Sequence, residues 1–169
     1  MMKTDFSVRT AVLEDGPRIS ALLSATYPLE FARCYSQEIL RVALPLMTRA
    51  NLQLLASGTY YVAEIPSGLM VACGGWTMAR PGTGETVTEL GHIRHFATHP
   101  LWARQGIGRA LVSRCFQDAR GRGVKSLECM SSLVAESFYR AMGFEMVRSI
   151  NVELNLEVSL PALLMRREI

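Results

Sequence analysis

The stretch HPLWARQGIGRAL, residues 99–111, lies between a segment that predicts a β-strand and a segment that predicts an α-helix. Residues 86–98 before it are rich in β-branched side chains, whereas residues 111–119 repeat apolar side chains at helical spacing. Glycines at such a junction let successive backbone N–H groups point into one concavity at the start of the helix. Arg104 and Arg109 add positive charge there. The stretch therefore favours a bound phosphate.

The charge pattern around this junction also indicates an anionic ligand. From Arg94 to Lys125 the chain has six arginines and one lysine against a single acid, Asp118, although its net charge is only +3. A local excess of this kind points to an anionic partner at one site, and a solvated basic helix face is the alternative. Nucleic-acid binding is a further alternative, but the rest of the chain has no basic run that would extend the contact. We therefore expect no nucleic-acid partner.

The composition is that of a globular domain. Of 169 residues, 49% are hydrophobic and 20% are charged, and no repeat or linker divides the chain, so we expect one domain over residues 1–169. No apolar run approaches the ~20 residues of a membrane-spanning helix, and Asp5 interrupts the position of a secretion signal. We therefore expect a cytoplasmic protein with no membrane partner. The four cysteines form no C-x-x-C pair, so they predict no metal site.

The N-terminal third predicts a strand followed by helices. Residues 6–9 predict a short strand, and a helix is expected to begin at Asp15, with a proline at an early position where its missing N–H does no harm. The segment 27–31 interrupts the helical pattern. A second helix is expected over 36–47, with Pro45 kinking or ending it.

The remaining elements predict a mixed sheet. Three extended segments separated by turns predict an antiparallel meander, over 59–65, 69–79 and 86–98. The helix after the glycine turn should end at Gly121 or Gly123, and the next strand then returns by a right-handed parallel crossover. The last elements expected are a strand over 124–130, a helix over 133–142, and strands over 144–152 and 161–166. The fold class is therefore a mixed α/β (α+β) domain with antiparallel and parallel pairing in one sheet.

Two common phosphate-binding motifs do not match the glycine turn. The P-loop needs G-x-x-x-x-G-K-[ST], and the sequence contains no such string. The dinucleotide-binding fingerprint needs G-x-G-x-x-G in the first strand–helix unit, whereas Gly106 and Gly108 are followed by Leu111 and lie late in the chain. Both of these nucleotide-binding classes are therefore excluded.

The same region resembles the GNAT superfamily of acyl-CoA-dependent N-acetyltransferases. In that family a strand ends in an apolar-x-apolar-x-Pro phrase, and [QR]-x-x-G-x-[GA] then opens a helix; here the phrases are FATHP at 96–100 and ARQGIG at 103–108. ESFYRAMGF at 136–144 is similar to the family's F-Y-x-x-x-G-F phrase. Two positions depart from the family, because Ala103 replaces the usual Gln or Arg and Val134 replaces an Asn that reaches the cofactor in many members.

The resemblance implies the fold, the co-substrate and the residues that bind it. The fold is a GNAT-like mixed central sheet, with an antiparallel N-terminal meander, parallel fourth and fifth strands splayed around the cofactor, and about four flanking helices. The co-substrate is acetyl-CoA. Its pyrophosphate would be held by the backbone amides of Arg104, Gln105, Gly106, Ile107, Gly108 and Arg109, and its pantetheine by the strand edge at Phe96, Ala97 and Thr98.

The resemblance also implies direct transfer of the acetyl group to an amine, which needs no enzyme nucleophile. Tyr139 would lie near the thioester sulfur as the general acid, and packing of the short helix is its alternative role. His92 stands where several family members have a glutamate that deprotonates the amine, and an unbroken strand would put it on one face with Phe96. Glu89 and His95 are the next candidates for this base.

The sequence therefore predicts an acetyl-CoA-dependent N-acetyltransferase acting on a primary amine of a small molecule or peptide. A non-catalytic acyl-CoA-binding sensor that keeps the phosphate site without turnover is the alternative. Zinc binding by the three histidines would need a helix, whereas their surroundings favour an extended chain, so we expect no metal. Homodimers are common in the family, so the resemblance implies a homodimer as one possible oligomeric state. Candidates for the acceptor groove are Tyr27, Phe31, Tyr35, Trp76, Glu30 and Glu38.

Overall fold

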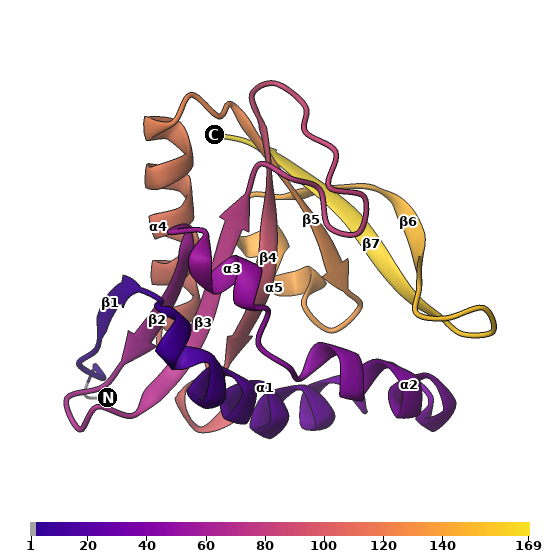
Figure 1. The fold of residues 1–169 in the computed structure, drawn as a ribbon, viewed down its shortest axis with the longest axis horizontal. Helices are drawn as coiled ribbons and strands as arrows, with labels where there is room; N and C mark the ends of the chain where they lie inside the picture. Colours follow the sequence, from indigo (N-terminus) through magenta and orange to yellow (C-terminus); the bar gives the residue numbers. More distant parts are fainter. Residues whose placement is uncertain (1–2) are drawn as a thin grey trace.

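The structure of the protein is a computed structural model that describes residues 3–169. Seven strands form one sheet in the order β1-β2-β3-β4-β5-β7-β6 (Figure 1). β1 to β4 pair antiparallel, β4 and β5 pair parallel, and β5, β7 and β6 pair antiparallel, which confirms the predicted mixed sheet. The strands are β1 Ser7–Thr10, β2 Tyr60–Glu64, β3 Met70–Thr77, β4 Leu90–Thr98, β5 Ser126–Ser132, β6 Glu145–Glu153 and β7 Ser159–Glu168.

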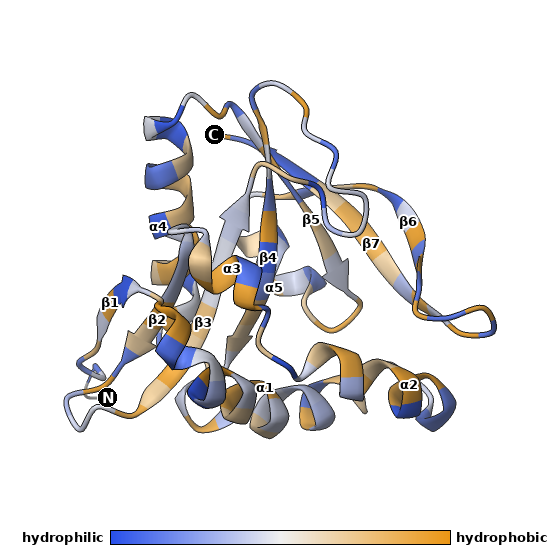
Figure 2. Ribbon diagram, in the orientation of Figure 1, coloured by the Kyte–Doolittle hydropathy of each residue, from blue (hydrophilic) through white to orange (hydrophobic). Residues whose placement is uncertain are grey.

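Helices cover the two faces of this sheet (Figure 1). They are α1 Gly16–Phe31, α2 Gln37–Met47, α3 Leu52–Ala56, α4 Ile107–Gly121 and α5 Glu136–Ala141, with short 3-10 turns η1 Leu13–Asp15 and η2 Pro100–Trp102. None of the helices within residues 3–169 is long and apolar enough to cross a membrane. Hydrophobic and hydrophilic residues alternate along α4 in Figure 2, as expected for a helix that buries one side.

Side-chain alternation along β2 separates two hydrophobic clusters. Tyr61 belongs to a cluster built around α4, whereas its neighbours Tyr60 and Val62 belong to a cluster built around α1 and α2. Successive side chains of a strand point to opposite faces, so the clusters lie on opposite sides of the sheet. We refer to these sides as the α4 face and the α1 face.

β4 and β5 are paired over only a short part of their length. Leu90–His92 of β4 pairs with Ser126–Glu128 of β5, although β4 continues to Thr98 and β5 to Ser132. The two strands therefore diverge beyond His92. This divergence confirms the splayed fourth and fifth strands that the family resemblance implied.

The segment 27–31 is helical, so the predicted interruption of α1 is wrong. Pro28 has no N–H to donate to the carbonyl four residues earlier. Tyr27 and Phe31 are nevertheless buried, and their rings stack with centroids 4.9 Å apart. Packing of these rings on the α1 face outweighs the lost hydrogen bond. α2 contains Pro45 and ends two residues later, as expected.

β4 begins later than the sequence predicted. Residues 86–89 form a loop with isolated bridges, and Glu89 has a φ of 64°, a left-handed conformation that does not continue a strand. Helix α3 was not predicted, because it is only five residues long. The Asn51 side chain caps it by accepting hydrogen bonds from the N–H groups of Gln53 and Leu54.

Candidate active site

The start of α4 directs free backbone donors toward the end of β4. Gly106 is the N-cap residue, with a left-handed φ of 84° that favours glycine. The Ala110 N–H donates to the Gly106 carbonyl at 3.0 Å, so the N–H groups of Ile107, Gly108 and Arg109 have no partner within the helix. Together with the positive end of the helix dipole they form an anion site.

Two glycines of this turn are needed for different reasons. A Cβ at Gly106 would meet no heavy atom of residues 3–169 within 4 Å, so only its backbone conformation requires glycine. A Cβ at Gly108 would lie 3.2 Å from the Phe138 ring and 3.4 Å from the Thr98 hydroxyl. The turn therefore packs closely on β4 and α5 and leaves the Gly106 side accessible.

The arginines of the basic stretch do not form one surface. The guanidinium of Arg114 lies 5.1 Å from the ring centroid of Tyr61, and that of Arg122 lies 5.8 Å from the ring centroid of Trp76. Arg104 and Arg109 are exposed at the glycine turn, and neither forms a salt bridge with another residue in the range 3–169. Arg104 and Arg109 are therefore the residues of the basic stretch that place unpaired positive charge at the turn.

The end of β4 presents a free backbone edge. The His99 N–H donates to the Val71 carbonyl at 2.8 Å, which makes these residues a hydrogen-bonded pair between β3 and β4. Such pairs recur at every second residue, so the backbone groups of Ala97 point to β3, and those of Phe96 and Thr98 point to the other side. Because β5 has diverged, the N–H groups of Phe96 and Thr98 have no partner among the described strands. The backbone groups of Ala97 pair with β3, so Ala97 contributes no donor to the free edge.

A β-bulge lies between His92 and this free edge. Cys73 of β3 pairs with Ala97, but Gly75 pairs with Arg94, so β4 has one residue more than β3 over this interval. The extra residue is accommodated at His95, whose φ is 54°. A bulge of this kind shifts the side chains that follow it to the opposite face.

The bulge separates the His92 side chain from that of Phe96. Ile93 and Phe96 both pack in the cluster on the α4 face. Alternation from Ile93 places His92 and Arg94 on the α1 face, where His95 also lies with its ring against the Met47 carbonyl. The prediction that His92 and Phe96 share one face is therefore wrong, because it assumed an unbroken strand.

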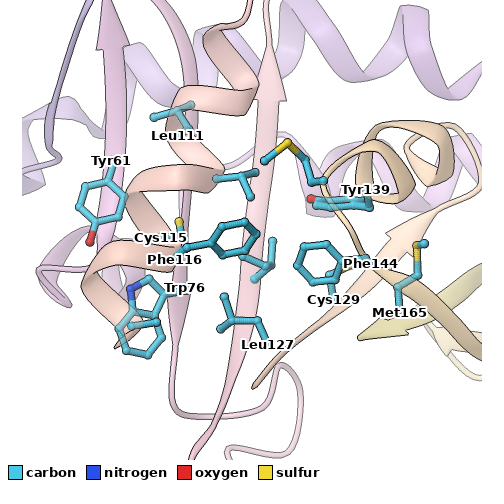
Figure 3. Close-up of a cluster of buried hydrophobic side chains, with 14 of the residues drawn as sticks. Tyr61, Trp76, Leu111, Cys115, Phe116, Leu127, Cys129, Tyr139, Phe144 and Met165 are labelled. Atoms are coloured by element: carbon cyan, nitrogen blue, oxygen red, sulfur yellow. The ribbon is translucent and has the colours of Figure 1, made fainter. Parts of the chain in front are cut away.

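Tyr139 lies across the divergence from Phe96. Their ring centroids are 6.4 Å apart, and Tyr139 also packs edge-on against Phe144 at 5.5 Å, beside Cys129 (Figure 3). Its side chain is buried, and its hydroxyl makes no hydrogen bond to any of residues 3–169. Burial raises the pKa of Tyr139 well above its ordinary value, so the hydroxyl keeps its proton.

His92 is buried beside an acid that sequence reasoning missed. Its Nδ1 lies 4.0 Å from Oε2 of Glu128 on β5, and within residues 3–169 neither that oxygen nor His92 Nε2 has a hydrogen-bond partner. Burial lowers the pKa of His92, so the imidazole is neutral at neutral pH. Arg80 and Arg166 approach the same carboxylate at 3.6 and 3.8 Å. The available signal was an acid between Leu127 and Cys129 in an otherwise apolar strand.

The structure does not bring Glu89 to the free edge. Glu89 lies just before β4 begins, and its Oε1 forms a salt bridge of 2.7 Å with Nζ of Lys125. At about 3.3 Å per residue, the strand separates Glu89 from Thr98 by roughly 30 Å. This separation argues against Glu89 as a base.

The three histidines lie in three different surroundings. His95 Nε2 lies 2.8 Å from the Met47 carbonyl, and burial lowers the pKa of its imidazole. His99 Nδ1 accepts a hydrogen bond from the Leu101 N–H at 3.2 Å and so caps η2. His92 alone of the three lies beside an acid and has a buried nitrogen without a partner among residues 3–169.

The acceptor-groove candidates are divided between the two faces. Tyr27 reaches the strand edge, because its hydroxyl donates to the Phe96 carbonyl at 2.8 Å. The Tyr35 hydroxyl donates to the Pro161 carbonyl at 2.7 Å on the α1 face. Trp76 instead packs on the α4 face, and so cannot belong to a groove with Tyr27.

Comparisons with known proteins agree with this geometry. The family model described as acetyltransferase (GNAT) domain matches residues 56–146. A probable N-acetyltransferase family 8 member 5 from Mus musculus is 31% identical over 114 residues, which make up 66% of this chain and 48% of that protein. The chain thus spans about half the length of this curated relative.

Similar solved structures extend over nearly the whole chain. A GCN5-related N-acetyltransferase from Rhodopseudomonas palustris has a TM-score of 0.80 and 20% identity, covering 100% of this chain and 99% of its own. The PaiA N-acetyltransferase from Thermoplasma acidophilum, solved in complex with coenzyme A, has a TM-score of 0.71 and 12% identity, covering 98% of this chain and 99% of its own. At these identities the likeness shows the fold alone.

Proposed function

Because the chain belongs to the acetyltransferase (GNAT) domain family, we propose that it transfers an acetyl group from acetyl-CoA directly to a primary amine of a small molecule or peptide. One observation carries this proposal. β4 and β5 diverge beyond His92, and the divergence exposes a backbone edge that leads from the Tyr139 hydroxyl to the glycine turn of α4. Acetyl-CoA needs these three groups in this order: a proton for its sulfur, backbone partners for its pantetheine amides and donors for its phosphates.

The glycine turn of α4 and the free edge of β4 together fit coenzyme A. The amides of residues 104–109 would hold the pyrophosphate, helped by the charges of Arg104 and Arg109. The edge groups of Thr98 would bind the pantetheine amides as a neighbouring strand would, and the Phe96 N–H remains for the thioester end. These contacts use the backbone, so the departures at Ala103 and Val134 leave them intact.

The same edge supplies the electrostatic part of the reaction. When bound, acetyl-CoA brings an acetyl group activated as a thioester. The Phe96 N–H would donate to the developing oxyanion, while the Phe96 carbonyl stays occupied by Tyr27. Tyr139 would donate its proton to the departing sulfur as the carbon–sulfur bond breaks.

His92 would accept the proton that the amine loses as the carbon–nitrogen bond forms. Its neutral imidazole, its free Nε2 and the neighbouring Glu128 carboxylate support this role, because the carboxylate stabilises the imidazolium that results. His92 lies on the α1 face and about four residues before the reacting edge, so the proton would cross by way of water. His95 is the alternative base, and its bond to Met47 weakens its case.

The test is acetyl-CoA-dependent release of free thiol with a panel of primary amines. We expect turnover by the wild-type protein and a loss of about 100-fold in kcat for Tyr139→Phe. Acetyl-CoA affinity should stay unchanged in the variant, since the hydroxyl has no partner among residues 3–169. Acetyl-CoA binding without turnover on any amine would favour the acyl-CoA sensor instead.

A further inference from the structure

Arg94 is a half-buried arginine on the α1 face whose donors are mostly unused. Its Nη1 donates to the Thr77 hydroxyl at 3.0 Å. Within residues 3–169 it forms no salt bridge, and this is its one side-chain hydrogen bond. A guanidinium carries five N–H donors, so most of them lack a protein acceptor. A half-buried cation in this state is costly unless water or a ligand completes it.

The other arginines near this place differ from Arg94. Arg80 approaches both Glu85 and Glu128, at 3.9 and 3.6 Å. Arg166 approaches Glu128 at 3.8 Å and also donates to the Ser126 hydroxyl. Both cations therefore have carboxylates of the protein nearby. Arg94 is left available for a carboxylate that the protein does not supply.

Arg94 also lies close to the reacting edge. It comes two residues before Phe96, with the bulge at His95 between them. Thr77, to which it donates, is the strand partner of His92, so His92 and Arg94 flank one threonine on the same face. An acceptor whose carboxylate is held by the guanidinium would extend its nitrogen toward Phe96, and water would connect that nitrogen to His92.

We propose that Arg94 binds a carboxylate of the acceptor, so that the preferred substrates are small amines that carry a carboxylate a few bonds from the nitrogen, as amino acids do. This inference rests on the proposed acetyltransferase function. Arginine suits the role because its planar fork binds a carboxylate through two parallel hydrogen bonds, which fix the orientation of the molecule. Arg94 is then a specificity-determining residue, with no proton to transfer.

The experiment compares matched pairs of acceptors that differ only in the carboxylate. The pairs are phenylalanine with phenethylamine, leucine with 3-methylbutylamine, and lysine with cadaverine, each assayed by thiol release at saturating acetyl-CoA. The variants are Arg94→Met, which keeps the stem and removes the charge, and Arg94→Lys, which keeps the charge. Arg114→Met is the matched control, because it removes an equal charge on the α4 face.

The wild-type protein should prefer the acid of at least one pair by about 10- to 100-fold in kcat/KM. Arg94→Met should abolish that preference, because it should lower kcat/KM for the acid and leave kcat/KM for the matched amine unchanged. Arg94→Lys should restore part of it, and Arg114→Met should behave as wild type. Equal rates for acid and amine in every pair, or an equal loss for both in Arg94→Met, would overturn the inference and leave the acetyltransferase function standing.

A binding measurement separates the two proposals if no amine is turned over. N-acetylphenylalanine should raise the Tm of the wild-type protein more than N-phenethylacetamide does, and this difference should vanish in Arg94→Met. Equal shifts for the two amides, or the same difference in both proteins, would overturn the role of Arg94. Absence of turnover beside an Arg94-dependent shift would instead overturn the proposed activity.

Discussion

The Tyr27 hydroxyl donates a hydrogen bond of 2.8 Å to the Phe96 carbonyl, and so fixes α1 to β4 at the place where β5 no longer supports it. Tyr27 is buried, and its ring stacks on Phe31 one turn later. The bond occupies the Phe96 carbonyl and leaves the Phe96 N–H as the donor at this point of the edge. Helix α1 thus supports the edge on which the acetyl group would react.

Tyr27→Phe should weaken this support. Loss of the hydroxyl leaves a half-buried carbonyl without its donor, which should lower the free energy of unfolding by about 1 kcal/mol and the Tm by roughly 2–4 °C. We also expect kcat to fall several-fold, because the edge is less well fixed. Tyr61→Phe is the control, since its hydroxyl bonds Asp118 on the α4 face and its loss should affect stability alone. Equal kcat values for wild type and Tyr27→Phe would separate α1 from the reacting edge.

Gly106→Asp should abolish acetyl-CoA binding. The carboxylate would occupy the place proposed for the pyrophosphate, and we expect affinity to fall on the order of 100-fold by calorimetry. Gly58→Asp is a matched control, because Gly58 has a φ of 78° and, like Gly106, has open space within residues 3–169 where a Cβ would stand. The two variants should lose similar stability. Normal binding by Gly106→Asp would show that the phosphates lie elsewhere.

His92→Gln should lower the rate most strongly near neutral pH. A general base contributes roughly 100- to 10,000-fold, and part of this loss should be recovered at higher pH, where more of the amine is already deprotonated. His95→Gln removes an imidazole from the same face that is bonded to Met47, and should leave the pH–rate profile unchanged. If His95→Gln alters the profile and His92→Gln does not, the base is His95.

The buried histidines should also make the fold sensitive to mild acid. Burial lowers the pKa of both His92 and His95 below the 6.5 of an exposed imidazole. Between each lowered pKa and 6.5 the unfolded chain binds protons that the folded protein does not, so stability falls as pH falls through this window. Urea unfolding at pH 7.0 and 5.5 should show this loss. It should be smaller in His92→Gln and His95→Gln, by less than about 1.4 kcal/mol per pH unit each.

Local sequence signals were sufficient for most of the fold, including the glycine turn at which we propose that phosphate binds. The glycine turn, the apolar stripe of α4 and the meander depend on residues close together in the chain. The interruption predicted at 27–31 failed for a tertiary reason, because ring packing of Tyr27 and Phe31 keeps Pro28 within a helix. Propensity alone does not include that packing energy.

The acceptor side of the site could not be predicted in the same way. The alternation rule put His92 on the face of Phe96, but the bulge at His95 depends on the left-handed conformation of one residue. Glu128 meets His92 only through the short parallel pairing of β4 and β5, which joins segments far apart in the chain. Neither the bulge nor the register of the β4–β5 pairing can be predicted directly from the sequence.

A thermal-shift titration with acetyl-CoA, with ATP at equal concentration as the control, tests the central claim most directly. At 100 times its dissociation constant, a ligand that binds only the folded protein stabilises it by about 2.7 kcal/mol, a Tm shift of a few degrees. The edge at Phe96 and Thr98 and the turn at Gly106 together predict a shift with acetyl-CoA and none of similar size with ATP. Equal shifts with both ligands, or no shift with acetyl-CoA, would contradict the acetyl-CoA site.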